Sequence, residues 1–313
     1  MTRLLEVEKL SVSFGTMPAV DAISFGVEEG EILGLVGESG CGKTTAALAL
    51  MRLLRGARVE GAVRLDEVDL LALDEAAMRR RRGSELAMIF QDPATALHPT
   101  IRVGDQLVET LRAHLKLSVR EARSRALDLF RKVGIAAPED RLRAFPHEMS
   151  GGMCQRVMIA IAIACSPRLL LADEPTTALD VTVQAQILEL LRQVTRDAGM
   201  SVILITHDLG VVAGMTDRVA VMYAGAIVES APTDRLFAAP RHPYTRGLLG
   251  SIPALDRGWD DPIATLPGGV QSAFEVAGCR FSPRCPLATK ACRAAPGLRE
   301  VDPGHFVACW NAA

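Results

Sequence analysis

A glycine-rich segment near the start of this 313-residue chain has the residue types that phosphate binding requires. It follows the pattern of glycine, any four residues, glycine, lysine and then serine or threonine, and comprises Gly37, Glu38, Ser39, Gly40, Cys41, Gly42, Lys43 and Thr44. Glycines let backbone N–H groups curl around phosphate oxygens, and a helix that follows presents its positive end. We expect Lys43 to face the β- and γ-phosphates and Thr44 to offer its hydroxyl to Mg²⁺.

A second segment places two carboxylates directly after a run of apolar residues. Leu169–Ala172 predicts a strand buried on both faces, and Asp173 and Glu174 follow it. In open α/β sheets, ligands bind at the carboxyl ends of the strands. We therefore expect Asp173 to hold Mg²⁺, directly or through water, and Glu174 to polarise the attacking water.

The pattern of the chain supplies the elements that would position these residues. Residues 4–36 predict strands, and residues 44–54 predict a helix after the glycine-rich loop. Three helical patterns between residues 104 and 165 predict an α-helical subdomain, which we place at about residues 92–165. Residues 169–172, 182–198 and 202–205 then predict a strand, a helix and a strand, which form a βαβ unit.

A third motif precedes the predicted strand at residue 169. The run Phe145-Pro146-His147-Glu148-Met149-Ser150-Gly151-Gly152-Met153 resembles the signature motif of ABC ATPases. The phosphate loop, Gln91, the signature, the Asp173–Glu174 pair, Ala178-Leu179-Asp180 and His207 follow one another in the order that this family has. The resemblance covers residues 4 to about 230. It implies an α/β fold with an ABC-type P-loop ATPase core, an antiparallel β entry region, an α-helical subdomain and a small irregular C-terminal extension.

The resemblance also implies roles for individual residues. Phe14 would stack on adenine, and Gln91 would contact Mg²⁺ and the attacking water. Asp180 would couple two sites across a dimer, and His207 would contact the γ-phosphate. The predicted catalytic residues are Glu174, His207 and Gln91. The predicted nucleotide contacts are Phe14, residues 37–44, Thr45, Asp180 and, on the ATP of the opposite subunit, Ser150, Gly151 and Gly152.

The signature departs from the usual pattern at Met149 and Met153, where leucine and glutamine are common. The second change is familiar in the peptide-importer branch of the family. Cys154 stands where that branch often has a basic residue, which leaves the local packing open. Two of the predicted contacts also have plain structural interpretations: Phe14 as a core aromatic residue and His207 as a hydrogen-bonded residue at the end of a strand.

The last part of the chain differs from the rest in composition. Prolines are frequent beyond about residue 241. We therefore expect residues 1–240 to form the ATPase domain and residues 241–313 the extension. The run Arg241–Leu249 resembles the motif that opens the extension of dipeptide, oligopeptide and nickel importer ATPases. Four cysteines follow, separated by 5, 6 and 16 residues: Cys279, Cys285, Cys292 and Cys309. Relatives with a similar region carry a [4Fe–4S] cluster, which implies one here; zinc and no metal are the alternatives.

Composition narrows the class of protein further. The net charge of −2 gives no reason to expect a nucleic-acid partner, and neither a signal peptide nor a membrane-spanning run is visible. The resemblance implies a peripheral subunit at the cytoplasmic face of the membrane that powers peptide uptake. Its partners would be a second ATPase subunit, which is a paralogue or a copy, two permeases and an extracytoplasmic binding protein. The alternatives are nickel as cargo, a soluble ABC ATPase acting on DNA or ribosomes, and an inactive nucleotide-binding subunit.

Overall fold

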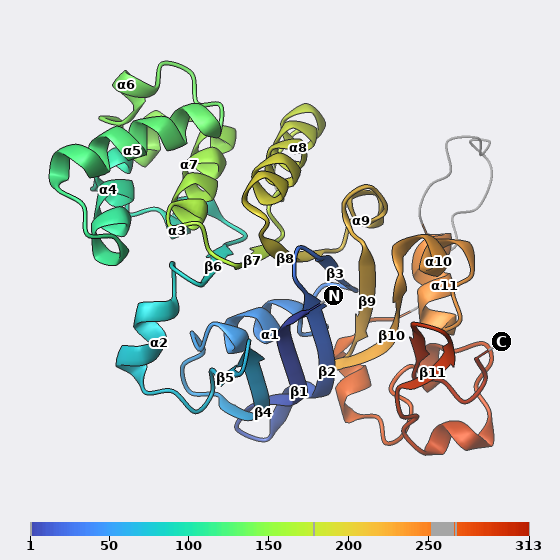
Figure 1. Ribbon diagram of the computed structural model, residues 1–313. Helices are drawn as coiled ribbons and strands as arrows, with labels where there is room; N and C mark the ends of the chain where they lie inside the picture. Colours follow the sequence, from blue (N-terminus) through green and yellow to red (C-terminus); the bar gives the residue numbers. More distant parts are fainter. Residues whose placement is uncertain (1, 178, 252–265, 267, 313) are drawn as a thin grey trace. The chain divides into compact units, whose positions relative to one another are not determined.

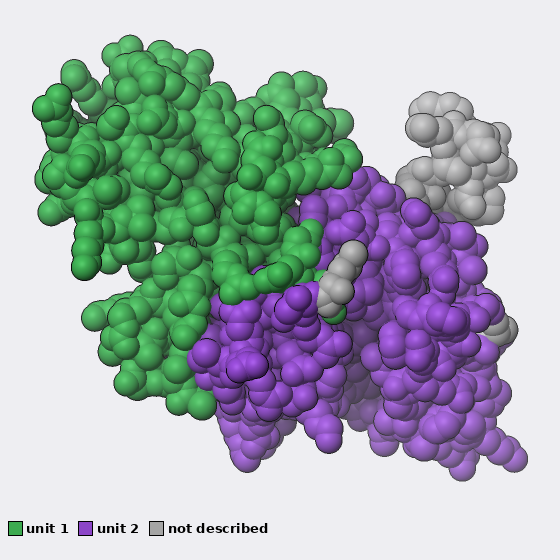
Figure 2. Space-filling model, in the orientation of Figure 1, with its two compact units in different colours: residues 1, 28–30, 72–203 green, residues 2–27, 31–71, 204–313 purple. Residues whose placement is uncertain are grey.

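The computed structural model describes residues 2–177, 179–251, 266 and 268–312. The chain divides into two compact units, which Figure 2 colours separately. Unit 1 comprises residue 1, residues 28–30 and residues 72–203, and unit 2 comprises residues 2–27, 31–71 and 204–313. Each unit is described by itself below.

Unit 2 contains an antiparallel sheet built from the start of the chain (Figure 1). Its strand order is β2-β1-β4-β5, with β1 at Arg3–Phe14, β2 at Met17–Glu28, β4 at Arg58–Leu65 and β5 at Val68–Asp69. Leu5 pairs with Leu65 and Val7 with Val63 across β1 and β4, and all four side chains are buried. Alternation of buried and exposed residues is the period-2 pattern of a sheet with one covered face. The predicted antiparallel entry region is confirmed.

A second set of strands in unit 2 contains the strand that leads into the glycine-rich loop. Strand β3 (Ile32–Val36) pairs in parallel with β9 (Arg218–Tyr223), and β9 pairs antiparallel with β10 (Ala226–Pro232). Every residue of β3 is buried, as expected for a strand covered on both faces. The helices of this unit are α1 at Lys43–Leu50, α9 at Leu209–Met215, α10 at Thr233–Ala238 and α11 at Pro243–Gly250.

Unit 1 is mainly helical, as the sequence predicted (Figure 1). Its helices are α2 at Glu75–Arg81, α3 at Pro93–Ala96, α4 at Val103–His114, α5 at Val119–Lys132, α6 at Pro138–Arg141, α7 at Gly151–Ile163 and α8 at Val181–Ala198. Ser118 and Glu121 form a reciprocal capping box at the start of α5. Ala122, Ala126 and Phe130 recur at intervals of four residues and are all buried, so one face of α5 forms the core of the subdomain.

Two parallel strands of unit 1 carry the carboxylate motif. Strand β6 (Leu86–Ile89) pairs with β7 (Leu169–Asp173), and both are fully buried. Strand β8 (Ser201–Thr206) begins in unit 1 and ends in unit 2. The predicted strand, helix and strand at residues 169–205 are therefore confirmed as β7, α8 and β8.

The C-terminal extension is more ordered than the sequence predicted. Short 3₁₀ turns at Gln271–Glu275, Ser282–Arg284 and Lys290–Arg293 precede a hairpin of β11 (Arg299–Asp302) and β12 (His305–Val307). Strand β12 pairs with β10, so the hairpin extends the β3-β9-β10 sheet. Strands this short, with prolines nearby, have too few residues to show the alternation of apolar and polar side chains from which a strand is predicted.

The extension shares a core with the strands on which it packs. Phe281 is 1% exposed, and its ring lies 5.3 Å from that of Tyr223 on β9 and 5.5 Å from that of Tyr244 on α11. The apolar surface around Phe281 therefore comes partly from α11, at the start of the extension, and partly from β9, which lies outside residues 241–313.

No described helix combines the length and the hydropathy that crossing a bilayer requires.

Candidate functional site: a phosphate loop and a strand-end carboxylate

The glycine-rich loop joins the end of β3 to the start of α1 within unit 2. Gly37 and Gly42 have φ angles of 153° and 108°. A Cβ at Gly37 would collide with the Met222 carbonyl oxygen, and one at Gly42 with the Ala19 carbonyl oxygen. Both positions therefore need glycine for space as well as for conformation. Gly42 caps α1, so the positive end of this helix opens onto the loop.

Lys43 lies inside the loop rather than in solvent. Its side chain donates hydrogen bonds to the carbonyl oxygens of Gly37 at 2.7 Å and Glu38 at 3.0 Å, and the residue is 5% exposed. Cys41 is fully buried beside it, with Sγ 3.8 Å from Nζ. Burial raises the pKa of the Cys41 thiol. Lys43 thus holds its charge inside the loop, and its contact with phosphate stays a prediction.

The other residues predicted to contact nucleotide in unit 2 are accessible. Ser39, Gly40 and Thr44 are exposed, and Thr45 is partly buried. Phe14 ends β1 with 43% of its surface exposed. It is not a core aromatic residue, and its stacking role stays a prediction.

In unit 1, Gln91 and Glu174 meet at the ends of neighbouring parallel strands. Ile89 of β6 pairs with Ala172 of β7, so the residue two places further along each strand emerges at the same level. The Gln91 amide donates to the Glu174 carboxylate at 3.1 Å, and the Thr177 hydroxyl donates to the same carboxylate at 2.8 Å. Both hydrogen bonds end on the same oxygen, Oε2, and together they orient the carboxylate.

The two acidic residues differ in their surroundings. Asp173 ends β7 and is 2% exposed, while Glu174 is partly buried. Glu174 has a φ angle of 44°, a left-handed conformation that costs free energy for a residue with a Cβ. Strain of this kind clusters at functional sites, and here it turns the chain sharply where the β7 strand ends.

The signature segment forms the start of helix α7. Ser150 caps this helix and accepts the Met153 N–H at 3.3 Å, and Gly151 is exposed. A Cβ at Gly152 would come within 2.8 Å of a Val183 methyl on α8, so a larger residue would push the helices apart. Cys154 is buried and donates to the Pro146 carbonyl oxygen at 3.4 Å. Cys154, which stands where the peptide-importer branch often has a basic residue, therefore packs inward.

The sequence analysis missed Gln155, which lies one turn into α7. It is 2% exposed, and its amide donates to the Pro175 carbonyl oxygen at 2.6 Å. Pro175 directly follows Glu174, so this hydrogen bond joins helix α7 to the loop that begins at Glu174. A glutamine inside a long apolar helix pattern was the available signal, because a buried amide needs a partner.

Asp180 and His207 stand at the ends of other elements. Asp180 caps α8 by accepting the Val183 N–H at 2.9 Å, which gives it a structural role beside the predicted one. Ala178 of the same motif lies outside the described residues. His207 follows β8 and is exposed, and Asp208 after it caps α9. Gln91, Ser150, Asp173, Glu174 and Asp180 thus belong to unit 1, and Phe14, residues 37–45 and His207 belong to unit 2.

The four late cysteines lie near one another, but the predicted metal centre is not confirmed. Burial raises the pKa of the Cys279 thiol, and proximity to the other three thiols raises it further. Backbone N–H groups point at the sulfurs, as from Thr289 to Cys292 at 3.4 Å and from Asn311 to Cys309 at 3.3 Å. Such donors suit thiolate ligands. Among the described residues, however, no group of three or more candidate ligands is gathered closely enough to hold a metal ion.

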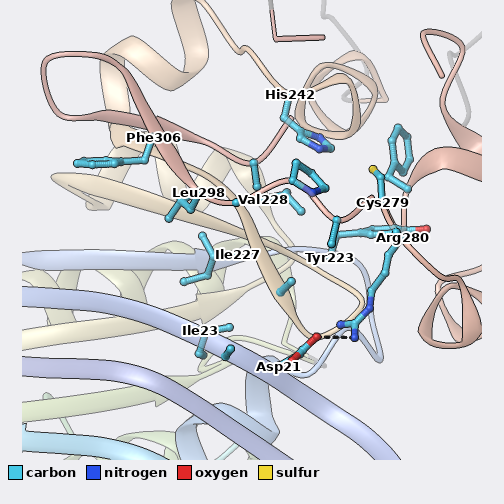
Figure 3. Close-up of a pocket in the computed structure, with 18 of the residues that line it drawn as sticks. Asp21, Ile23, Tyr223, Ile227, Val228, His242, Cys279, Arg280, Leu298 and Phe306 are labelled. Atoms are coloured by element: carbon cyan, nitrogen blue, oxygen red, sulfur yellow. Dashed lines mark hydrogen bonds and ion pairs between the residues drawn. The ribbon is translucent and has the colours of Figure 1, made fainter. Parts of the chain in front are cut away.

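A cavity of about 770 Å³ lies between β2, β10 and the extension (Figure 3). Ile23, Ile227, Leu298 and Phe306 contribute apolar walls, and an ion pair between Asp21 and Arg280 lies at one side. None of the described residues that line it belongs to the phosphate loop. The cavity is therefore separate from the predicted nucleotide contacts.

Comparison with known proteins identifies the class of this chain. Residues 20–177 match the family model described as ABC transporter, and residues 228–292 match the oligopeptide/dipeptide transporter C-terminal region. The chain is 50% identical to a probable peptide ABC transporter ATP-binding protein of Sinorhizobium fredii, over 99% of this chain and 95% of that protein. It is 48% identical to the dipeptide transport ATP-binding protein DppD of Bacillus subtilis, again over 99% and 95%.

Solved structures agree with this class. A dimeric ATP-binding cassette bound to ADP and Pi in a post-hydrolysis state has a TM-score of 0.66 and 26% identity, over 73% of this chain and 98% of that one. The structure of cbiO1 from Clostridium perfringens, described as part of the ABC transporter complex cbiONQ, has the same TM-score and identity, over 76% of this chain and 92% of that one. The chain therefore belongs to the ABC transporter family, as an ATP-binding subunit that hydrolyses ATP. ATP and Mg²⁺ follow from that class, and so do membrane permeases as partners.

Proposed function

We propose that this chain hydrolyses ATP to power the uptake of dipeptides and oligopeptides across the cytoplasmic membrane. The match of residues 228–292 to the peptide-transporter C-terminal region and the names of the similar proteins support this cargo. Nickel or another small solute is the alternative, because an ATPase subunit does not itself contact the cargo. We further propose that residues 1–240 form the ATPase domain and residues 241–313 the extension.

The proposed site lies between two ATPase subunits. Phe14 would stack on adenine, and the phosphate loop, from Gly37 to Thr45, would surround the phosphates of the same ATP. Ser150, Gly151 and Gly152 would donate hydrogen bonds to the γ-phosphate bound by the opposite subunit, where the exposed start of α7 presents N–H groups. His207 would contact the γ-phosphate, and Asp180 would couple the two sites. A solved relative described as dimeric supports this arrangement.

Glu174 would act as the general base in this site. It would take a proton from the attacking water while Gln91 orients the carboxylate and the water. Thr44, Asp173 and Gln91 would hold Mg²⁺, which when bound neutralises charge on the phosphates. The hydroxyl, carboxylate and amide groups of these three residues are polar groups with which Mg²⁺, water and nucleotide interact favourably.

The observation that carries the proposed chemistry is the contact between Gln91 and Glu174. A carboxylate that directly follows a buried aspartate, held at 3.1 Å by an amide from the next strand, is oriented before substrate arrives. Preorganised groups avoid reorganisation cost in the transition state. The intact pair also argues against the inactive-subunit alternative.

The proposed partners are a second ATPase subunit, two permeases and an extracytoplasmic substrate-binding protein. We favour a paralogue over an identical copy for the second ATPase, because two different ATPases are common in the importer branch that the extension resembles. The chain would then sit at the cytoplasmic face of the membrane as a peripheral subunit.

Transport by the assembled complex tests the cargo. Proteoliposomes with both permeases and both ATPases would receive binding protein, a labelled dipeptide or pentapeptide, and internal Mg²⁺-ATP. ATP-dependent accumulation of peptide is expected, and uptake of nickel without peptide uptake would favour the alternative cargo. The Glu174→Gln complex is the matched control, since it assembles the same surfaces without turnover.

We also propose that Cys279, Cys285, Cys292 and Cys309 hold one [4Fe–4S] cluster that staples the extension. The mutual proximity of the thiols and the N–H groups that point at them support it, and a small movement would have to gather the sulfurs. Anaerobically purified protein should be brown and contain about four irons per chain. Zinc in a colourless sample would favour the zinc alternative, and a metal-free sample would exclude both.

A further inference from the structure

A partly buried ion pair joins the C-terminal extension to the phosphate loop. The two terminal nitrogens of the Arg284 guanidinium donate to the Glu38 carboxylate, each at 3.0 Å, although the two residues are 246 positions apart in sequence. The side chains are 8% and 24% exposed. Paired, parallel hydrogen bonds from arginine to carboxylate fix orientation as well as charge. Glu38 is the second residue of the phosphate loop, so the extension holds the loop directly.

A second contact from the same part of the chain holds the backbone of Glu38. Its N–H donates to the Tyr244 hydroxyl at 2.9 Å, and Tyr244 on α11 is fully buried. Lys43 donates to the carbonyl oxygen of Glu38. The N–H, the carbonyl and the side chain of one loop residue are therefore all restrained, two of them by residues beyond position 240.

The groups that make these contacts are themselves fixed in place. The Arg284 guanidinium lies 5.6 Å from the ring centre of Tyr223 and 6.0 Å from that of Phe281, and it also donates to the Tyr223 hydroxyl at 3.3 Å. The Tyr223 and Tyr244 ring centres are 4.7 Å apart. Aromatic faces favour a guanidinium, and a packed cluster leaves it little freedom.

The charge of Arg284 has a consequence for nucleotide binding. Glu38 places a carboxylate in a loop that has to accept a polyanion, and a partly buried carboxylate without a partner would repel the phosphates. The bidentate pair neutralises that charge. The pair thus acts on the loop in two ways, by holding its backbone and by removing a repulsive charge.

We propose that Arg284 and Tyr244 are positioning residues for ATP binding, through which the C-terminal extension keeps the phosphate loop competent for nucleotide. The proposal rests on the nucleotide-binding function of the loop and adds to it a requirement for residues outside the ATPase domain. An ordinary structural ion pair would instead only attach the extension to the rest of unit 2.

The chain contains such an ordinary pair as a matched control. Arg280, four residues before Arg284, donates to the Asp21 carboxylate at 2.6 Å (Figure 3). It also donates to the Ala224 carbonyl oxygen at 2.6 Å. Neither partner belongs to the phosphate loop. Arg280→Gln therefore removes contacts of the extension with other parts of unit 2 but none of the hydrogen bonds to Glu38.

The experiment measures Mg²⁺-ATP affinity and the nucleotide-free unfolding temperature of the full chain. We expect Arg284→Gln to weaken ATP binding about tenfold and Tyr244→Phe about threefold, with little change for Arg280→Gln. Arg284→Lys, which keeps the charge but loses the paired geometry, should fall between the wild type and Arg284→Gln. In the assembled transporter, Arg284→Gln should raise KM for ATP while kcat changes little.

A double variant separates the role of the charge. Glu38→Gln removes the carboxylate, so combining it with Arg284→Gln should recover part of the lost affinity, which gives a non-additive cycle. Equal ATP affinity in the wild type and Arg284→Gln, with equal drops in unfolding temperature for Arg284→Gln and Arg280→Gln, would overturn the proposal. Failure of the wild-type chain to bind ATP would instead contradict the nucleotide site itself.

Discussion

The amide of Gln91 lies 3.1 Å from the carboxylate of Glu174 because both residues leave neighbouring parallel strands at the same level. The register places Ile89 beside Ala172, and Gln91 and Glu174 each lie two residues beyond this pair, just after β6 and β7 end. The strand register alone brings the two residues together, without any particular loop conformation. A conservative substitution at Gln91 or Glu174 should therefore alter the carboxylate's surroundings and leave the strands unchanged.

Glu174→Gln should abolish turnover while preserving ATP binding. The substitution keeps the size of the side chain and a hydrogen-bonding group but removes the base, which costs about 10²-fold or more in kcat. ATPase activity of the assembled transporter and a binding isotherm for ATP measure the two effects. Thr177→Val is the matched control, because it removes the 2.8 Å hydrogen bond to Glu174 and leaves the carboxylate. Near-normal turnover in Glu174→Gln would remove Glu174 from its assigned role.

Lys43→Ala should act on nucleotide affinity rather than on the chemical step. It deletes the charge that we propose faces the phosphates, and also the hydrogen bonds from Nζ to Gly37 and Glu38, which hold the loop together. Phe14→Ala should lose about 1 kcal/mol of binding free energy, because the ring is exposed and offers only a stacking face. Isothermal titration with ATP compares the two variants. Unchanged affinity in Lys43→Ala would contradict its assignment.

The sequence predicted the elements around the phosphate loop because each prediction depends on neighbours in the chain. The glycine spacing, the buried strand before it and the helix after it all lie within residues 32–50. The same holds for the apolar strand that ends in Asp173 and for the signature at the start of α7. Local patterns of this kind fix strand, turn and helix without any knowledge of the fold.

The contacts that the sequence could not predict join distant residues. Arg284 and Glu38 pair across 246 residues, and Gln155 reaches Pro175 across 20 residues in a fold where β7 intervenes. Arg284 lies in a proline-rich stretch whose apolar residues show neither helical nor strand periodicity. Its burial follows from the packing of Phe281 against Tyr223 and Tyr244, which no local pattern encodes.

Gln155→Leu should lower both stability and turnover. Leucine fits an apolar helix face, but it cannot donate a hydrogen bond to the buried Pro175 carbonyl oxygen. Losing that bond should lower the free energy of unfolding by about 1–3 kcal/mol. Because Pro175 follows Glu174, a looser loop should also lower kcat more than it raises KM. Urea unfolding and steady-state ATPase assays measure these effects. Gln186→Leu on α8 is the control, since that glutamine is exposed, and an equal loss in both variants would contradict the assignment.

The last prediction concerns the buried contact between α11 and β10. His242 is 1% exposed, its ring Nδ1 accepts the Tyr244 N–H at 3.0 Å, and its backbone N–H donates to the Glu229 carboxylate at 2.9 Å. Glu229 is also fully buried and accepts a hydrogen bond from His305 at 2.7 Å. Burial lowers the pKa of His242 to about 4, against a smaller opposite effect of Glu229.

This pKa makes stability depend on pH in one direction. The unfolded chain binds a proton at His242 below its ordinary pKa of 6.5, while the folded chain stays neutral there down to a pH of about 4. Stability should therefore fall as the pH drops through this window, by about 2 kcal/mol between pH ~7.5 and pH ~5 from this residue alone. His242→Asn keeps an acceptor for the Tyr244 N–H but does not titrate, so its free energy of unfolding should fall less over the same interval. Urea unfolding at both pH values compares the two proteins, and equal losses in both would assign the pH dependence to other groups.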